Sequence, residues 1–279
     1  MSSISNNFID EFGPWALVAG ASEGIGAAFA REVAKKGLNV AIISRRKEVL
    51  EELAKEINEK YQVQTKVIEQ DLTSPNLLDE LTSKTKDLNL GLVIFNAALS
   101  LIGLFHNTSI EVHQRVIDLN CRAPMILSYH FGNKMKERGK GGIILMSSLA
   151  GLQGNPIHTH YSATRAYNIN LAEGLWDELK NDGIKVMVVL AGPTKTPNYY
   201  KSDPKELASV KSMILEPQAV AKQALNAFRR IKKPYFIPGV KNRFTSFFLQ
   251  HFMTRKARIK LMGSVARTMY GENKDHFTS

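Results

Sequence analysis

Short apolar runs alternate with amphipathic segments of helical period along most of this chain, and this alternation restricts its fold more than any other feature. The apolar runs occupy residues 15–19, 40–43, 67–69, 92–95, 143–146 and 186–190. Nearly unbroken Val, Ile and Leu runs are typical of strands that are buried on both faces, and the intervening helices supply the crossovers of a parallel sheet. We therefore predict an α/β fold with a doubly wound parallel sheet in a single domain.

A glycine-rich turn follows the first apolar run and opens the first helix. Its sequence is Gly20-Ala21-Ser22-Glu23-Gly24-Ile25-Gly26. Glycines at such a turn permit a sharp bend, close approach of a pyrophosphate to the backbone, and tight packing of helix on strand. A connector without a ligand is the alternative interpretation, but the position between strand and helix favours the dinucleotide site of a Rossmann fold. We assign to cofactor binding Gly20, Ser22, Glu23, Gly24, Ile25 and Gly26.

The end of the second strand indicates which dinucleotide this is. Sites for NAD carry an acidic residue there, about 20 residues after the glycine turn, which binds the ribose 2′-hydroxyl. This strand ends instead in Ile43-Ser44-Arg45-Arg46. Because arginine is a charged bidentate donor and no carboxylate stands there to repel an anion, Arg45 and Arg46 favour the 2′-phosphate of NADP(H). The alternative is that both arginines form the solvated start of the next helix.

The composition is that of a globular protein in a reducing compartment. Hydrophobic residues make up 44% of the 279, enough for a full-sized core. Cys121 is the only cysteine, which excludes an internal disulfide, and residues 1–13 lack the features of a secretory signal. The longest apolar stretch, residues 92–105, is shorter than the roughly 20 residues of a membrane-spanning helix. We expect a cytoplasmic location.

The net charge of +11 arises near the C-terminus. Residues 217–271 hold 12 Lys and Arg and no Asp or Glu. The rest of the chain has the other 25 of the 37 basic residues and all 26 acidic residues, so it is nearly neutral. We divide the chain into a dinucleotide-binding and catalytic domain, residues 1–240, and a basic C-terminal extension, residues 241–279. No recognised nucleic-acid motif accompanies the cations, so we do not expect nucleic acid as a partner.

Residues 241–267 of this extension form an amphipathic aromatic segment. Its phenylalanines recur at helical spacing and are followed by cations: Phe244, Phe247, Phe248, Phe252, Arg255, Lys256, Arg258 and Lys260. Such a segment can lie on an anionic membrane surface. The alternative is that it packs on the body or on a second subunit and leaves its cations in water. We expect a homo-oligomer.

Further motifs follow one another along the chain. Asn96-Ala97-Ala98 ends the fourth strand, Asn120 lies in the next helix, Ser148 ends the fifth strand, Tyr161 comes 13 residues later, and Gly192-Pro193-Thr194-Lys195-Thr196 follows the sixth. In this combination residues 14–240 resemble the short-chain dehydrogenase/reductase family, whose patterns are TGxxxGxG, NNAG, a mid-helix Asn, a Ser, YxxxK and PGxxxT. The resemblance implies an NADP(H)-dependent oxidoreductase. Arg165 is the main departure, because it stands where the family has lysine.

The resemblance also implies roles for individual residues. The catalytic set is Asn120, Ser148, Tyr161 and Arg165. Cofactor contacts beyond those already assigned are Asp71, Leu72, Asn96, Ala97, Ala98, Tyr161, Arg165, Gly192, Pro193, Thr194 and Thr196. An aspartate in the position of Asp71 is equally compatible with a helix cap.

Tyr161 and Arg165 are one helical turn apart, so the cation lies near the phenol and makes its hydroxyl a better proton donor. We predict that Tyr161 protonates a substrate carbonyl oxygen, which Ser148 also stabilises, while NADPH delivers hydride to the carbon. Arginine can supply the charge and ribose contact of the family's lysine, but it does not deprotonate and cannot relay a proton through itself. A non-catalytic NADP(H)-binding or scaffold protein is therefore the alternative function.

Asn120 lies four residues before Pro124. Proline has no N–H, so the carbonyl of Asn120 should lose its helical partner and the helix should kink. We expect the free carbonyl to accept a bound water, which is the role that the family assigns to this position. The alternative is that Pro124 only ends or kinks a surface helix.

Residues 197–215 are expected to cover the substrate. Tyr199, Tyr200, Met213 and Leu215 offer apolar area without clustered cations, which suits a hydrophobic carbonyl compound, lipid-like or steroid-like. His158 and His160 precede Tyr161, but no third ligand accompanies them. We therefore assign no metal and expect the histidines to line the pocket or to face solvent.

Overall fold

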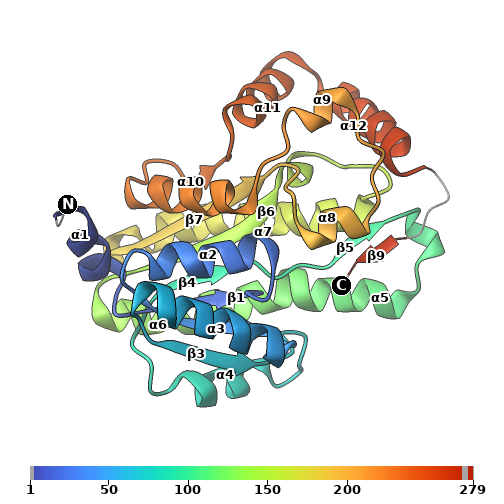
Figure 1. The fold of residues 1–279 in the computed structure, drawn as a ribbon. Coiled ribbons are helices and arrows are strands. Elements are labelled where there is room, and N and C mark those ends of the chain that lie inside the picture. Colours follow the sequence, from blue (N-terminus) through green and yellow to red (C-terminus); the bar gives the residue numbers. More distant parts are fainter. Residues whose placement is uncertain (1–2, 272–275, 279) are drawn as a thin grey trace.

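Seven parallel strands form one twisted sheet at the centre of the computed structural model, which describes residues 3–271 and 276–278 and the side chains of residues 8–271 (Figure 1). The strand order is β3-β2-β1-β4-β6-β7-β8. The strands are β1 (Trp15–Ala19), β2 (Asn39–Ser44), β3 (Thr65–Glu69), β4 (Leu90–Phe95), β6 (Gly141–Ser148), β7 (Ile184–Ala191) and β8 (Tyr235–Phe236). The predicted doubly wound sheet is confirmed, with β8 as an additional short edge strand.

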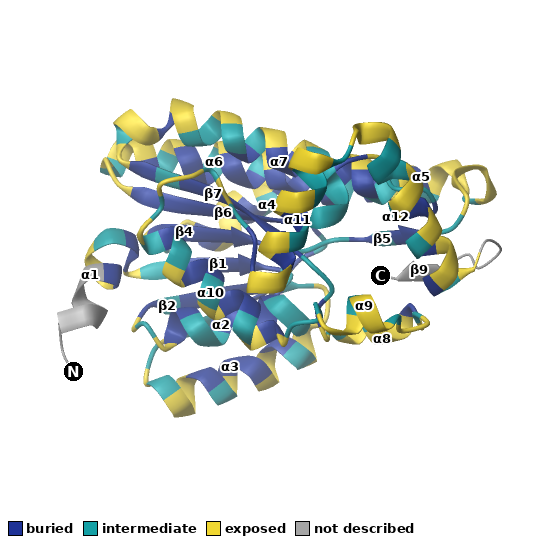
Figure 2. Ribbon diagram, turned by 90° about the horizontal axis from the view of Figure 1, so that it is seen from above, coloured by how far each residue is buried: buried dark blue, intermediate teal, exposed yellow. Residues whose placement is uncertain are grey.

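Helices cover both faces of this sheet (Figure 2). On one face lie α1 (Ser3–Phe12), α2 (Gly24–Ala34), α3 (Lys47–Tyr61) and α10 (Pro217–Arg229), and on the other α4 (Leu77–Thr85), α6 (Ala123–Arg138) and α7 (Thr159–Glu178). Because side chains alternate along a strand, Leu17 and Val18 enter opposite cores and both are fully buried. This two-sided burial explains the unbroken apolar runs. Short 3₁₀ turns lie at Phe105–Asn107, Leu149–Leu152 and Lys180–Asp182.

The helix that carries Asn120 widens instead of ending at Pro124. Helix α5 (Ile110–Ile117) continues through a π-helical turn (Asp118–Arg122) into α6. Pro124 lies in the first turn of α6, but the helix runs on from the π-helical turn without a break, so the missing N–H leaves one carbonyl of that turn without a backbone donor. The wide turn thus accommodates the proline.

The direction of winding reverses between β1 and β4. From β1 the chain winds outward to β3, and from β4 it winds the other way to β8. The strand registers place Ala19, the last residue of β1, beside Phe95, the last residue of β4, and beside Ile43, the last but one of β2. The crevice beyond the carboxyl ends at such a switch point is the usual ligand site of open α/β sheets.

The C-terminal helices α11 (Val240–Phe252) and α12 (Arg255–Tyr270) lie at this end of the molecule with the short helices α8 (Pro197–Lys201) and α9 (Ala208–Lys211) (Figures 1 and 2). Ala266 of α12 packs on Ile102 and Ile157. Strand β5 (Ser100–Ile102) pairs with β9 (His276–Thr278), which brings the end of the chain beside the segment that follows β4. Among the described residues, no helix is both long enough and apolar enough to cross a membrane.

Candidate active site

A cavity of about 950 Å³ lies at the carboxyl ends of the strands. Its walls come from the turns after β1, β2, β3, β4, β6 and β7, from α7, and from the C-terminal helices. Ligand sites have volumes of roughly 300–1,000 Å³, so this cavity is at the upper end of that range. A volume of this size suits a cofactor together with a substrate.

Nearly all residues that were assigned from the sequence line this cavity. They are Gly20, Ser22, Glu23, Gly24, Ile25, Arg45, Arg46, Asp71, Leu72, Asn96, Ala97, Ala98, Ser148, Tyr161, Arg165, Gly192, Pro193, Thr194 and Thr196. Asn120 and Gly26 are absent from the lining. The cavity is also lined by polar residues that the motifs did not indicate, among them Ser100, Gln153, Asn155, Asn198 and Ser202.

Two glycines of the turn, Gly20 and Gly26, have no room for a side chain. A Cβ on Gly26 would lie 1.9 Å from the carbonyl oxygen of Gly20 and 2.7 Å from Nδ2 of Asn96. Gly20 itself has a φ of +81°, and Asn96 donates a hydrogen bond to its carbonyl at 3.0 Å. Gly26 therefore acts in the packing of α2 on the turn, and Ala21 is buried in the core, while the other residues of the turn line the cavity.

Arg46 binds two side chains of the glycine turn. Its Nη2 donates to Ser22 Oγ at 2.7 Å and lies 2.6 Å from Glu23 Oε2. The strand end considered alone has no carboxylate near the arginines, but the fold brings Glu23 to them from a turn that is distant in sequence. Arg45 is exposed at the same rim of the cavity and makes no such contact with the turn.

Asp71 caps its own turn at the cavity wall. Its Oδ1 accepts hydrogen bonds from the N–H and the hydroxyl of Thr73, at 2.9 and 2.8 Å. Burial alone would raise the pKa of this carboxyl, but the Thr73 bonds and the nearby cations Arg115 and Arg45 outweigh it, and the pKa of Asp71 is lowered. The carboxylate is therefore ionised and held in place beside the cavity.

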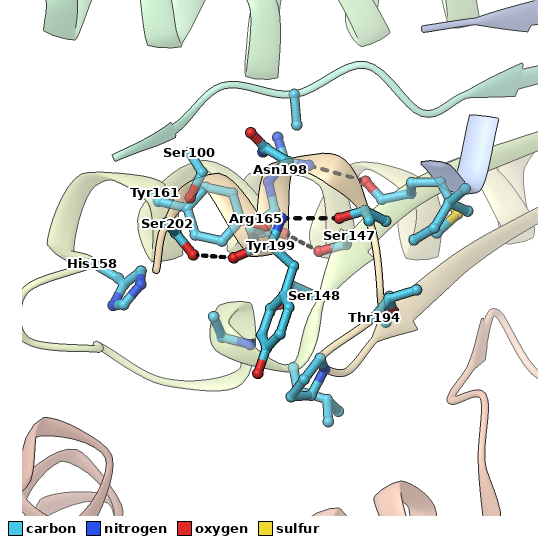
Figure 3. Close-up of a pocket in the computed structure, with 18 of the residues that line it drawn as sticks. Ser100, Ser147, Ser148, His158, Tyr161, Arg165, Thr194, Asn198, Tyr199 and Ser202 are labelled. Carbon is cyan, nitrogen blue, oxygen red and sulfur yellow. Dashed lines mark hydrogen bonds between the residues drawn. The ribbon is translucent and has the colours of Figure 1, made fainter. Parts of the chain in front are cut away.

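Tyr161 and Arg165 lie side by side on α7, as their spacing predicted (Figure 3). The guanidinium carbon is 5.2 Å from the centre of the tyrosine ring. Arg165 is only 2% exposed, and its Nη1 donates to the carbonyl of Met146 at 3.3 Å. Burial lowers the pKa of Arg165, and Tyr161 and Cys121 partly oppose that effect. Its Nε and Nη2 have no hydrogen-bond partner among the described residues, so two buried donors of a cavity-lining cation are left for a ligand.

Ser147 and Ser148, at the end of β6, make different hydrogen bonds. Ser147 Oγ donates to the carbonyl of Arg165 at 2.8 Å, which ties α7 to the sheet. Ser148 Oγ accepts a hydrogen bond from the N–H of Ala150 at 3.2 Å and lines the cavity. That bond uses a lone pair of the Ser148 oxygen and leaves its proton available for donation.

The expectation of a free carbonyl at Asn120 is wrong. Nδ2 of Asn168 donates to this carbonyl at 2.9 Å. The fully buried side chain of Asn120 bonds the N–H and the carbonyl of Leu99, both at 2.9 Å, and Oγ1 of Thr164 at 3.0 Å. Sequence reasoning could not foresee Asn168, because α7 reaches Asn120 only through the tertiary fold. Asn120 thus holds α7 against the segment that follows β4.

His158 and Tyr199 contribute polar atoms that have no hydrogen-bond partner among the residues whose side chains are described. Burial lowers the pKa of His158 to about 4, and its Nδ1 has no hydrogen-bond partner among the described residues. The ring packs edge-on against Tyr270, with centroids 5.1 Å apart. The Tyr199 hydroxyl is likewise unpartnered, and burial raises its pKa to about 12. Both side chains line the cavity and are neutral near pH 7, so each can bond an uncharged polar group of a substrate.

We expect His158 to make the protein sensitive to acid. Its pKa is about 4 in the fold against 6.5 for an unperturbed histidine, so the unfolded chain binds the extra proton first and stability falls as the pH drops from about 6.5 to 4. The loss from this residue should approach about 3 kcal/mol. Chemical denaturation at pH 7 and pH 4 should show a smaller acid loss for His158→Gln, whereas His106→Gln, at an exposed histidine, should behave as wild type. Equal acid losses in wild type and His158→Gln would contradict this prediction.

The outer wall of the cavity comes from α9, α11 and α12. Apolar side chains dominate it: Val210, Met213, Leu249, Leu261, Met262, Val265 and Met269. Of the covering residues expected from sequence, Tyr199 and Met213 line the cavity, but Tyr200 is exposed and Leu215 packs on the core of the sheet. The two C-terminal helices therefore replace much of the apolar wall that was attributed to residues 197–215.

His160 does not line the cavity. Its Nδ1 lies 2.7 Å from Nδ1 of His113, whose Nε2 lies 3.0 Å from the carbonyl oxygen of Phe105. Within residues 8–271, no three His, Cys, Asp or Glu side chains are grouped as metal ligands would be.

A family model described as short chain dehydrogenase matches residues 14–207. The chain belongs to this family. It is 35% identical over 241 residues to a 7β-hydroxysteroid dehydrogenase of Clostridium sardiniense, covering 85% of this chain and 90% of that protein. The relatives of this short-chain dehydrogenase carry dehydrogenase and reductase names, which supports an oxidoreductase activity.

Solved structures agree with this assignment. One from a study of 7β-hydroxysteroid dehydrogenase stereoselectivity is 28% identical, with a TM-score of 0.85 over 91% of this chain and 98% of that one. A short-chain dehydrogenase from Sphingobium yanoikuyae in complex with NADPH is 27% identical, with a TM-score of 0.74 over 90% of this chain and 95% of that one.

Proposed function

We propose that this short-chain dehydrogenase uses NADP(H) to interconvert a carbonyl and an alcohol on a hydrophobic, steroid-like or lipid-like substrate. The observation that carries the proposal is one cavity that joins three features: the glycine turn, the Ser148–Tyr161–Arg165 group and an apolar outer wall. A phosphate site, a proton donor and a hydrophobic compartment are together what such a reaction requires.

The residues present fit a nicotinamide dinucleotide. The bare glycine turn at the start of α2 offers backbone N–H groups and the positive end of a helix to a pyrophosphate. Arg45 and Arg46 suit a 2′-phosphate, and the two unpartnered donors of Arg165 suit the hydroxyls of a ribose. When bound, NADPH supplies the hydride. A structural neighbour that was solved with NADPH supports this choice of cofactor.

Side chains of the protein then protonate the substrate oxygen and stabilise its charge. Tyr161 donates its hydroxyl proton to the substrate oxygen as that oxygen becomes an alcohol, and Ser148 donates a hydrogen bond to the same oxygen. The guanidinium of Arg165 places a positive charge 5.2 Å from the centre of the tyrosine ring. Because a guanidinium keeps its proton, Arg165 does not pass a proton to Tyr161, and the tyrosine recovers its proton from water.

The outer wall favours an apolar substrate. Its methionine, leucine and valine side chains offer area for a hydrophobic skeleton, while His158 and Tyr199 offer isolated neutral hydrogen-bonding groups. A phosphorylated or highly charged substrate would need cations that this wall lacks. The similarity to a 7β-hydroxysteroid dehydrogenase supports the same class.

A binding protein without turnover is the second candidate, favoured by Arg165 alone. The two functions are separated by NADPH oxidation with a panel of hydrophobic ketones, for wild type and Arg165→Lys. We expect slow turnover by wild type and faster turnover by Arg165→Lys, with NADPH affinity changed only several-fold, because lysine adds a proton path but no new charge. If neither protein oxidises NADPH with any ketone while both bind it, the binding function is correct.

A further inference from the structure

Helix α11 is oriented with its polar side inward. Its buried residues are Asn242 and Ser246, at 1% and 7% exposure. Its phenylalanines face outward, with exposures of 71% for Phe244, 55% for Phe247, 50% for Phe248 and 69% for Phe252. An ordinary surface helix buries its apolar residues and exposes the polar ones. Packing within this chain therefore does not explain why the phenylalanines of α11 are exposed.

These four phenylalanines, here called the aromatic stripe, recur at helical spacing on the exposed side of α11. The rings of Phe248 and Phe252 stack with centroids 5.1 Å apart, and those of Phe247 and Phe252 are 6.4 Å apart. None of the four lines the cavity, since α11 turns Thr245, Ser246, Leu249 and Gln250 toward it. A contiguous exposed apolar surface of this kind marks contact with a partner or a membrane.

The charged residues of α11 and α12, the helix that carries the aromatic stripe and the helix that follows it, are all basic. Exposed Lys241 and Arg243 lie in the first turn of α11, and exposed Arg255 and Lys256 lie in the first turn of α12, directly after Phe252. Neither first turn contains an acidic residue, although the positive end of a helix favours one. Residues 217–271 contain no acidic residue at all. Exposed basic side chains thus stand before and after the stripe along the chain.

We propose that the aromatic stripe and its flanking cations bind this protein to an anionic phospholipid surface. Phenylalanine rings enter the boundary between headgroups and acyl chains, and cations beside them meet acidic headgroups. A second copy of the chain is a poorer occupant, because a symmetric dimer would set the same positively charged face against itself. The proposal is independent of the reaction in the cavity.

Co-sedimentation of the full chain with vesicles tests this. We expect association with mixed phosphatidylcholine–phosphatidylserine vesicles, little with phosphatidylcholine alone, and loss at high salt. Phe244→Ser/Phe252→Ser and Arg255→Glu/Lys256→Glu should each weaken association by at least about tenfold. The control for the phenylalanines is Ile110→Ser/Tyr129→Ser, which replaces two similarly exposed apolar residues elsewhere on the surface. The control for the cations is Lys55→Glu/Lys60→Glu, which makes the same change of charge on α3. Both controls should bind as wild type, and circular dichroism should show that every variant retains its fold.

Three results would overturn the proposal. They are no association of wild type with the mixed vesicles, equal association with neutral vesicles, and equal weakening by the matched controls. If Phe244→Ser/Phe252→Ser changes the oligomeric mass of a protein that does not bind vesicles, the stripe is a contact between copies of the chain.

Discussion

Tyr161→Phe is expected to lower kcat for ketone reduction by about 10²- to 10⁴-fold, the range for loss of a general acid. The ring still packs beside the Arg165 guanidinium, so NADPH affinity should change by no more than a few-fold. Tyr167→Phe removes a hydroxyl from the same helix outside the cavity and should retain full activity. Steady-state kinetics together with NADPH titration measure both effects. Undiminished turnover by Tyr161→Phe would exclude the proposed proton donor.

Arg45→Asp is expected to abolish or reverse a preference for NADPH over NADH. A charge-assisted hydrogen bond contributes roughly 1.5–3 kcal/mol, so wild type should bind NADPH about 10- to 100-fold more tightly. Arg45 is the more informative of the two arginines because Arg46 is already paired with Glu23. Lys55→Asp makes the same charge change on an exposed part of α3 and should leave the preference intact. Equal wild-type affinities for the two cofactors by titration would show that the arginines do not select the 2′-phosphate.

Local signals in the sequence were sufficient to locate the inner part of the site. Gly20, Asn96 and Gly192 each follow directly after a strand, and the carboxyl ends of parallel strands meet at one edge of the sheet. Tyr161 and Arg165 are placed by helical periodicity alone. Where a residue's role depends on its neighbours in sequence, the pattern was therefore enough.

Contacts between distant segments could not be predicted in the same way. The pairing of Arg46 with Glu23 and of Asn168 with the Asn120 carbonyl depends on strand order and helix packing. Helix α11 contradicts the usual use of hydrophobic periodicity, because its phenylalanines face outward and its Thr245 and Ser246 face the cavity. The sequence showed the amphipathic pattern but not which face of the helix meets the body.

A single-turnover experiment with wild-type protein tests the proposed reaction most directly. Protein preloaded with NADPH is mixed with a steroid that carries a ketone at carbon 7, and separately with other bulky hydrophobic ketones, while the reduced nicotinamide signal and the alcohol product are followed. We expect loss of the nicotinamide signal with an equal amount of alcohol formed from at least one ketone, and no such loss with Tyr161→Phe. Fully retained NADPH with every ketone, in wild type and in Arg165→Lys, would contradict the assignment as an oxidoreductase.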